Sequence, residues 1–126
     1  MSDFEAVSIY LRASALSDGV LVDVSPLAKE AGFKWPVAVT DHLYHGYIVP
    51  ALDLASVGQS ISGRLWDVFS VLRAAISTGK DLSSLNITVC FLMSPNASLE
   101  PVEILAVAGP GDSGEPVITI MLPEDY

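Results

Sequence analysis

The two histidines of the chain lie three residues apart and offer its clearest opportunity for chemistry. On a helix, His42 and His45 would share one face, with Asp41 beside them. Imidazole nitrogens bind metal ions and exchange protons near neutral pH. A catalytic zinc needs three protein ligands, however, and neither the HExxH pattern nor a third ligand at suitable spacing is present. A metal- or ligand-binding site or a small enzyme built on Asp41, His42 and His45, with Asp23 as a further partner, is therefore the alternative hypothesis for function.

A glycine-rich loop with two acids precedes the last apolar run, in GPGDSGEP at 109–116. A phosphate-binding loop opens a helix and carries a lysine, whereas this loop leads into the β-branched run VITIMLP. Its acids would repel phosphate, and they supply too few oxygen ligands for calcium. We therefore predict a β-hairpin in which Gly111 and Gly114 take positive φ and the side chain of Asp112 caps the turn, leaving Glu115 exposed.

The remaining nucleophiles give no sign of catalysis. Cys90 lies within an apolar strand pattern, so we predict a buried and unreactive thiol. No serine lies in a GxSxG context. We expect a protein that binds rather than catalyses, and we expect no cofactor.

Charge is the most informative bulk property of the chain. Fifteen acids and six bases give a net charge of -9, and every base lies within the first 80 residues. The segment from Asp81 to Tyr126 contains acids but no base. Such a surface repels nucleic acid and attracts a basic protein. The residues predicted to contact that partner are Asp112, Glu115, Glu124 and Asp125, supported by Glu100 and Glu103.

Length and composition indicate one domain covering residues 1–126. Hydrophobic residues make up 51% of the chain, which is enough for a core. No apolar run approaches the roughly 20 residues that cross a bilayer, and the first residues lack the basic region of a signal peptide. We expect a cytoplasmic protein with no membrane association. A homodimer formed through an apolar helix face or an exposed sheet edge is a further alternative.

The order of the elements predicts the α+β fold class, with helices followed by a three-stranded antiparallel C-terminal meander. Helices are expected at 10–17, 25–31, 40–48 and 60–78, and strands at 19–25, 86–94, 102–109 and 117–123. Residues 49–59 are expected to be mostly loop. The predicted helix caps are Ser8, Ser25 and Thr40, and the predicted stops are Gly19, Gly32 and Gly79.

The long helix at 60–78 is expected to pack on the sheet. Its apolar residues recur at steps of three and four, namely Ile61, Leu65, Val68, Leu72 and Ile76. Trp66 and Phe69 would widen this apolar face, and Trp35 would also lie in the core. Arg64 and Asp67 are expected to pair on the exposed side of the helix.

Three stretches resemble a family of uncharacterised proteins. They are DGVLVDVSPLAKEAGFKWPVAVT at 18–40, GRLWDV at 63–68 and GPGDSGEPVITIMLPED at 109–125. They are similar in the same order to a domain-of-unknown-function family of small proteins carried on bacterial plasmids, integrative elements and phages. The segment at 42–62 departs from the family pattern. The resemblance implies no activity, but it does imply mobile DNA that must survive in a host.

Charge and resemblance together give the main functional hypothesis. We expect a non-enzymatic accessory protein of a mobile element that binds a basic, nucleic-acid-handling host protein or ribonucleoprotein complex. An anti-CRISPR or anti-restriction inhibitor would act in this way, because an acidic surface can occupy a site built for nucleic acid.

Overall fold

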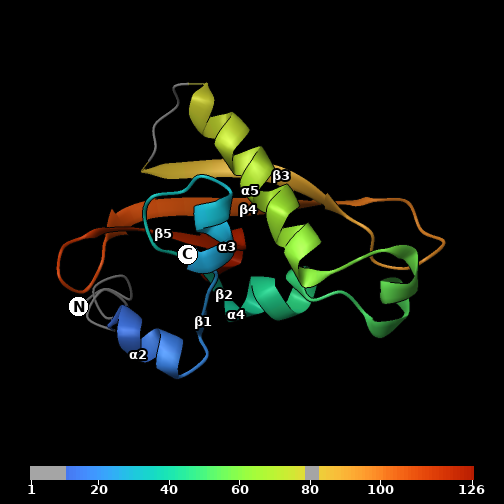
Figure 1. Ribbon diagram of the computed structural model, residues 1–126, viewed down its shortest axis with the longest axis horizontal. Helices are drawn as coiled ribbons and strands as arrows, with labels where there is room; N and C mark the ends of the chain where they lie inside the picture. The colour runs from blue at the N-terminus through green and yellow to red at the C-terminus, as the bar shows by residue number, and fades with distance from the viewer. Residues whose placement is uncertain (1–10, 79–82) are drawn as a thin grey trace.

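A five-stranded mixed sheet is the centre of the fold, in the order β1-β2-β5-β4-β3 (Figure 1). The computed structural model describes residues 11–78 and 83–126. The strands are β1 (Leu21–Asp23), β2 (Val37–Thr40), β3 (Ser84–Phe91), β4 (Glu100–Pro110) and β5 (Pro116–Met121). Neighbours pair antiparallel except β2 and β5, which are parallel. The predicted C-terminal strands do pair in sequence order, but the sheet is larger than the predicted meander because β1 and β2 extend it.

The two faces of the sheet differ, and β3 shows this most clearly. Its residues alternate between exposed and buried along all eight positions. Ile87, Val89 and Phe91 point into the core, whereas Thr88 and Cys90 lie on the opposite, exposed face. The prediction of a buried Cys90 is therefore wrong: the strand is covered on one face only, and Cys90 falls on the other.

The helices begin and end largely where the sequence indicates. They are α2 (Arg12–Ser17), α3 (Ser25–Glu30), α4 (Asp41–Leu43), which continues as the π-helix η1 (Tyr44–Ile48), and α5 (Ile61–Ser77). Two 3-10 helices complete the described elements, η2 (Leu52–Val57), inside the predicted loop, and η3 (Pro123–Asp125). None of the helices in the described ranges combines the length and apolar character that crossing a bilayer requires.

Several predicted helix signals are confirmed. Thr40 accepts a hydrogen bond from the backbone N–H of Leu43 at the start of α4. Gly19 and Gly32 follow α2 and α3 with positive φ, the conformation in which a side chain is strained. Ser25 differs slightly, because it is the first residue of α3 rather than its cap. The predicted cap Ser8 and stop Gly79 lie outside the described residues.

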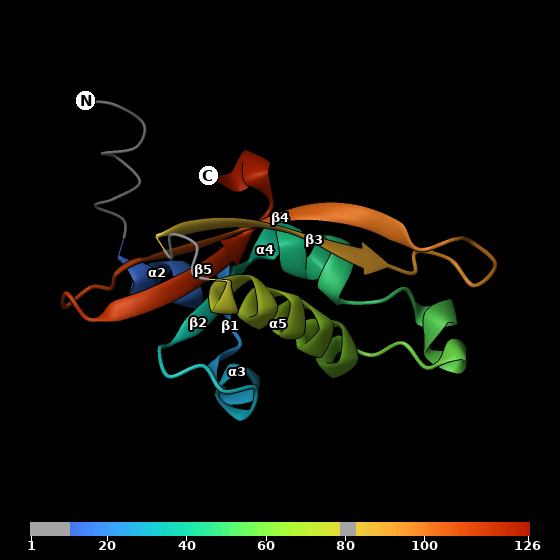
Figure 2. The same cartoon turned by 90° about the horizontal axis from the view of Figure 1, so that it is seen from above.

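The core lies between α5 and one face of the sheet. Figure 2 shows α3 and α5 on this side and η3 on the opposite side. Four residues of α5, namely Leu65, Val68, Phe69 and Leu72, are buried against Val39, Ile104 and Ile120 of three different strands. Full burial of each such side chain stabilises the fold by about 1.5–3 kcal/mol.

Four predictions about α5 and the tryptophans are corrected by the structure. Ile61, at the first position of the helix, is 38% exposed and does not belong to the buried face. Trp66 is 45% exposed and Trp35 is 42% exposed, so neither is a core residue. The inward stripe of α5 runs through positions 65, 68, 69 and 72, and position 66 lies beside it. Arg64, in contrast, is buried, so it forms no exposed pair with Asp67.

Candidate partner-binding groove

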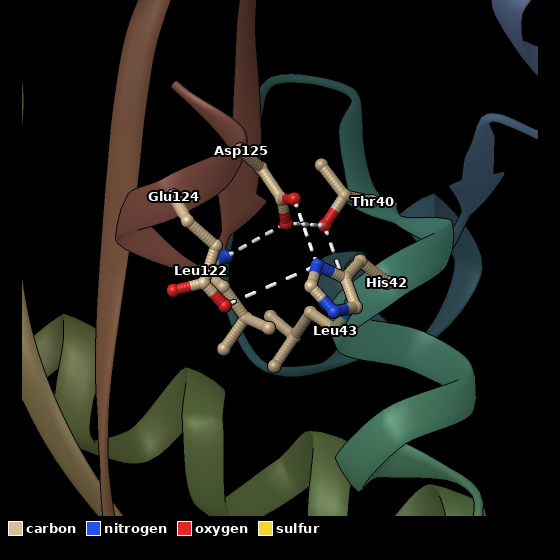
Figure 3. A network of polar contacts seen from close by, with 6 residues as sticks. All are labelled: Thr40, His42, Leu43, Leu122, Glu124 and Asp125. Carbon is tan, nitrogen blue, oxygen red and sulfur yellow. Dashed lines mark hydrogen bonds and ion pairs between the residues drawn. The ribbon is translucent and has the colours of Figure 1, made fainter.

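The C-terminal turn η3 is fixed to the start of α4 by the carboxylate of Asp125 (Figure 3). Its Oδ1 accepts a hydrogen bond from His42 Nδ1 at 3.0 Å. Its Oδ2 accepts from Thr40 Oγ1 at 2.9 Å and from the backbone N–H of Leu122 at 3.2 Å. Both oxygens of Asp125 are thus occupied within the fold, and the turn after β5 is held in one position.

His42 lies at the surface, with acidic groups around its imidazole. The hydrogen bond to Asp125 and the charge of that carboxylate raise the pKa of His42, and the charges of Glu124 and Asp41 act in the same direction. Glu124 Oε1 lies 4.0 Å from His42 Nδ1, and the Glu124 side chain is 65% exposed. The pair thus leaves most of the Glu124 carboxylate in water.

A groove of about 250 Å³ runs beside this turn. One wall is the start of β4, from Glu100 to Glu103, and the other is the segment from Leu122 to Glu124. Tyr47 of η1 lines it as well. Three of the six predicted acidic residues, Glu100, Glu103 and Glu124, therefore line one concave site.

The groove exists because β4 is longer than β5. β4 has eleven residues and β5 has six, and their pairing runs from Pro110 opposite Pro116 to Leu105 opposite Met121. Beyond that point the chain leaves the sheet to form η3. The first residues of β4 therefore face the groove, while their other side remains paired with β3.

Arg64 anchors the backbone at Tyr47, which forms the Tyr47 wall of the groove. Its Nη1 donates to the carbonyl of Tyr47 at 2.6 Å, its Nη2 donates to the carbonyl of Leu92, and its Nε donates to Gln59 Oε1 at 3.1 Å. The Tyr47 ring also packs on Phe91, with ring centroids 5.8 Å apart. Sequence reasoning missed Tyr47 and misplaced Arg64, although Arg64 lies four residues before the buried Val68 and thus on the inward stripe.

The hairpin acids lie at the opposite end of β5 and serve the fold. Asp112 accepts hydrogen bonds from the backbone N–H groups of Arg12 and Ala13, at 2.7 and 3.0 Å. It therefore caps α2, not the hairpin turn as predicted. These hydrogen bonds, that from Ala13 first, lower the pKa of Asp112. Glu115 accepts from the backbone N–H of Ser113 at 2.9 Å.

The positive charge of Arg12 offsets part of the negative charge at this end of β5. Its guanidinium bonds to Thr119 Oγ1 and to the carbonyl of Ile118, at 2.8 and 2.9 Å. Gly114 has the predicted positive φ, but Gly111 does not. A Cβ added at Gly111 would instead meet the carboxylate of Glu115, so the Glu115 side chain would have to move.

The histidines do not converge on a shared ligand site. His45 Nδ1 contacts Asp41 Oδ1 at 2.5 Å, while His42 contacts the C-terminal turn. Asp23 accepts hydrogen bonds from the backbone N–H and the hydroxyl of Ser25 at the start of α3. Within residues 11–78 and 83–126, no three histidine, cysteine or acidic side chains are grouped to hold a metal ion.

The chain belongs to a protein family of unknown function, DUF6573, which matches it over residues 1–126. This supports the resemblance found in the sequence to an uncharacterised domain family. No curated protein and no solved structure shows significant similarity to the chain.

Proposed function

We propose that this protein acts by binding a basic surface of a partner protein and carries out no chemistry itself. The observation that carries the proposal is that Glu100, Glu103 and Glu124 line one groove together with Tyr47. A concave site with several carboxylates and one aromatic ring suits a lysine- or arginine-bearing segment, which gains both charge pairing and ring contact.

The groove lies in a negative field, and no lysine or arginine lines it within the described residues, although Arg64 bonds to the carbonyl of Tyr47 and His42 lies 4.0 Å from Glu124. No lysine or arginine occurs in the sequence after Lys80, and the chain carries a net charge of -9. Such a field increases the association rate of a basic partner, and the rate falls as salt screens the charges. The same field disfavours direct contact with nucleic acid.

For the partner, we propose a basic, nucleic-acid-handling host protein met in the cytoplasm. The sequence resemblance to proteins of plasmids, integrative elements and phages supports this choice, because such elements must survive host defence. The acidic groove would then occupy a surface that the host protein uses for nucleic acid. An anti-CRISPR or anti-restriction activity would follow from that competition.

The test is binding to purified CRISPR effector complexes and restriction endonucleases, with two variants of equal net charge. E100K/E124K reverses two acids of the groove and leaves the bond between Glu103 and Thr88 intact. E30K/D67K reverses two exposed acids elsewhere as a matched control. We expect the groove variant to lose roughly tenfold or more in affinity, and we expect wild-type binding to weaken at moderate salt.

Equal affinities of the two variants would contradict the groove as the binding site. Failure of the wild-type protein to bind any of these complexes, at low or moderate salt, would contradict the proposed class of partner. A gel-shift assay with duplex DNA gives the complementary check, because we expect no shift.

A further inference from the structure

The start of β4 presents an open strand edge inside the groove. In an antiparallel strand the backbone groups of alternate residues point to alternate sides. The backbone N–H of Ala108 donates toward β3, to the carbonyl of Ser83, whereas that of Gly111 donates toward the β5 side, to the carbonyl of Glu115. By this alternation, Pro101 and Glu103 direct their backbone groups away from β3 and into the groove.

Proline explains why β5 leaves this edge unpaired. Leu105 lies opposite Met121, so the next residue of β5 to pair with Glu103 would be Pro123. Proline has no N–H to donate, and here it begins η3 instead of extending the strand. Within the described residues, the β4–β5 pairing ends at Leu105. Glu103 therefore has no β5 partner for its N–H and C=O, and Pro101 has none for its C=O.

We propose that an extended basic segment of the partner protein adds to the sheet here as a short strand beside residues 101–103 of β4. Its backbone would donate to the open carbonyls and accept from the N–H of Glu103, as in other cases of strand addition. The inference rests on the proposed function and deepens it, because it states how the basic partner is held.

The surrounding charges suit such a strand on both of its faces. Glu103 lies opposite Thr88 and Glu100 lies opposite Phe91, so their side chains leave β4 on different faces of the sheet. Glu124 lines the other wall. Lysines or arginines at successive positions of an added strand also point to alternate faces, so each face offers a carboxylate.

The test uses a synthetic peptide, acetyl-KTKKTK-amide, and a copy of it methylated on every backbone nitrogen. The two peptides have the same charge, but the methylated copy lacks the N–H donors that strand addition requires. Binding is followed by calorimetry, and hydrogen exchange is followed at the amide of Glu103 by NMR. We expect the methylated peptide to bind at least tenfold more weakly, and only the parent peptide to slow exchange at Glu103.

Equal binding of the two peptides, with exchange at Glu103 unchanged, would overturn strand addition. If E100K/E124K still weakened that binding, the acidic groove would remain the binding site and only strand addition would be excluded. If neither peptide distinguished E100K/E124K from E30K/D67K, the proposed function would fall as well. Concentration-dependent protection of Glu103 without peptide would also overturn the inference, since a second copy of the chain would then occupy the edge.

Discussion

Two acidic side chains lie near each end of β5, but the contacts that they make differ between the two ends. At the hairpin end, Asp112 caps α2 and Glu115 bonds to the backbone of its own turn. At the tail end, Asp125 fixes η3 to α4, but Glu124 remains largely exposed and lines a groove. Each end therefore has one acid that holds an element, and only the tail end also has a concave surface.

This difference shows why net charge alone does not locate a binding surface. Arg12 lies beside the hairpin acids and offsets part of their field, and the charges of Asp112 and Glu115 act on it in turn. The groove has no base among its lining residues. Which carboxylates can bind a partner depends on where each acidic residue lies relative to the neighbouring elements, more than on the number of acidic residues.

The largest expected effect comes from Arg64→Ala, which should destabilise the structure around the groove at the tail end of β5 and leave the hairpin end unchanged. The substitution leaves the part-buried carbonyls of Tyr47 and Leu92 without this donor, and it removes the anchor of the Tyr47 wall. We expect a loss of about 3 kcal/mol in the free energy of unfolding, measured by urea denaturation. Arg73→Ala is the control, since this exposed side chain donates to the carbonyl of Ala31 and to no other group of the described residues, and its loss should cost less than about 1 kcal/mol. Similar losses for both variants would contradict the buried role of Arg64.

A smaller loss is expected from Asp112→Ala, confined to the hairpin end. Because its folded pKa lies below the ordinary 3.8, the stability that the Asp112 carboxylate contributes is present above that pH and disappears as pH falls through the lowered pKa. Thermal melts of the variant and the wild type should therefore differ at pH 7 and converge in acid. Hydrogen exchange should be faster in α2 and unchanged in η3; faster exchange in both would mean that the two ends are not independent.

The tail end should respond to pH in the opposite sense. His42 has a raised folded pKa, so the stability from its pairing with Asp125 is full below pH 6.5 and disappears as pH rises through the raised value. We expect His42→Ala to lower the melting temperature at pH 5.5 and to approach the wild type at pH 9. A difference of the same size at both pH values would show that the charge of His42 does not matter.

The smallest effect is expected at Cys90, opposite Pro101 on the exposed face of the sheet. Its thiol should react with Ellman's reagent in the native protein, without denaturant. Cys90→Ser should change the free energy of unfolding by less than about 0.5 kcal/mol. If the thiol reacted only after unfolding, this face of the sheet would be covered in an interface and the prediction would be wrong.

Local signals predicted much of the fold. Gly19, Gly32 and Thr40 end or begin their helices as the sequence indicates, because each acts on its own neighbours. The alternation of Asn86, Thr88 and Cys90 with apolar residues also indicates that one face of β3 is exposed.

The missed features depend on contacts between distant residues. Asp112 caps a helix that begins 100 residues earlier, and β2 lies parallel to β5 across most of the chain. The six acids could be identified from the sequence, but their division between two ends could not. That division depends on where β5 ends. Pro123 ends the strand because it would be the residue paired with Glu103, and this pairing follows from the register with β4.

Matched single charge reversals at the two ends of β5 test the central claim most directly. E124K and E115K change the net charge equally, and each can be titrated with acetyl-KTKKTK-amide by calorimetry. We expect about threefold to fivefold weaker binding for E124K and no change for E115K. Equal weakening of both variants would contradict the account, because binding would then follow total charge and not the groove.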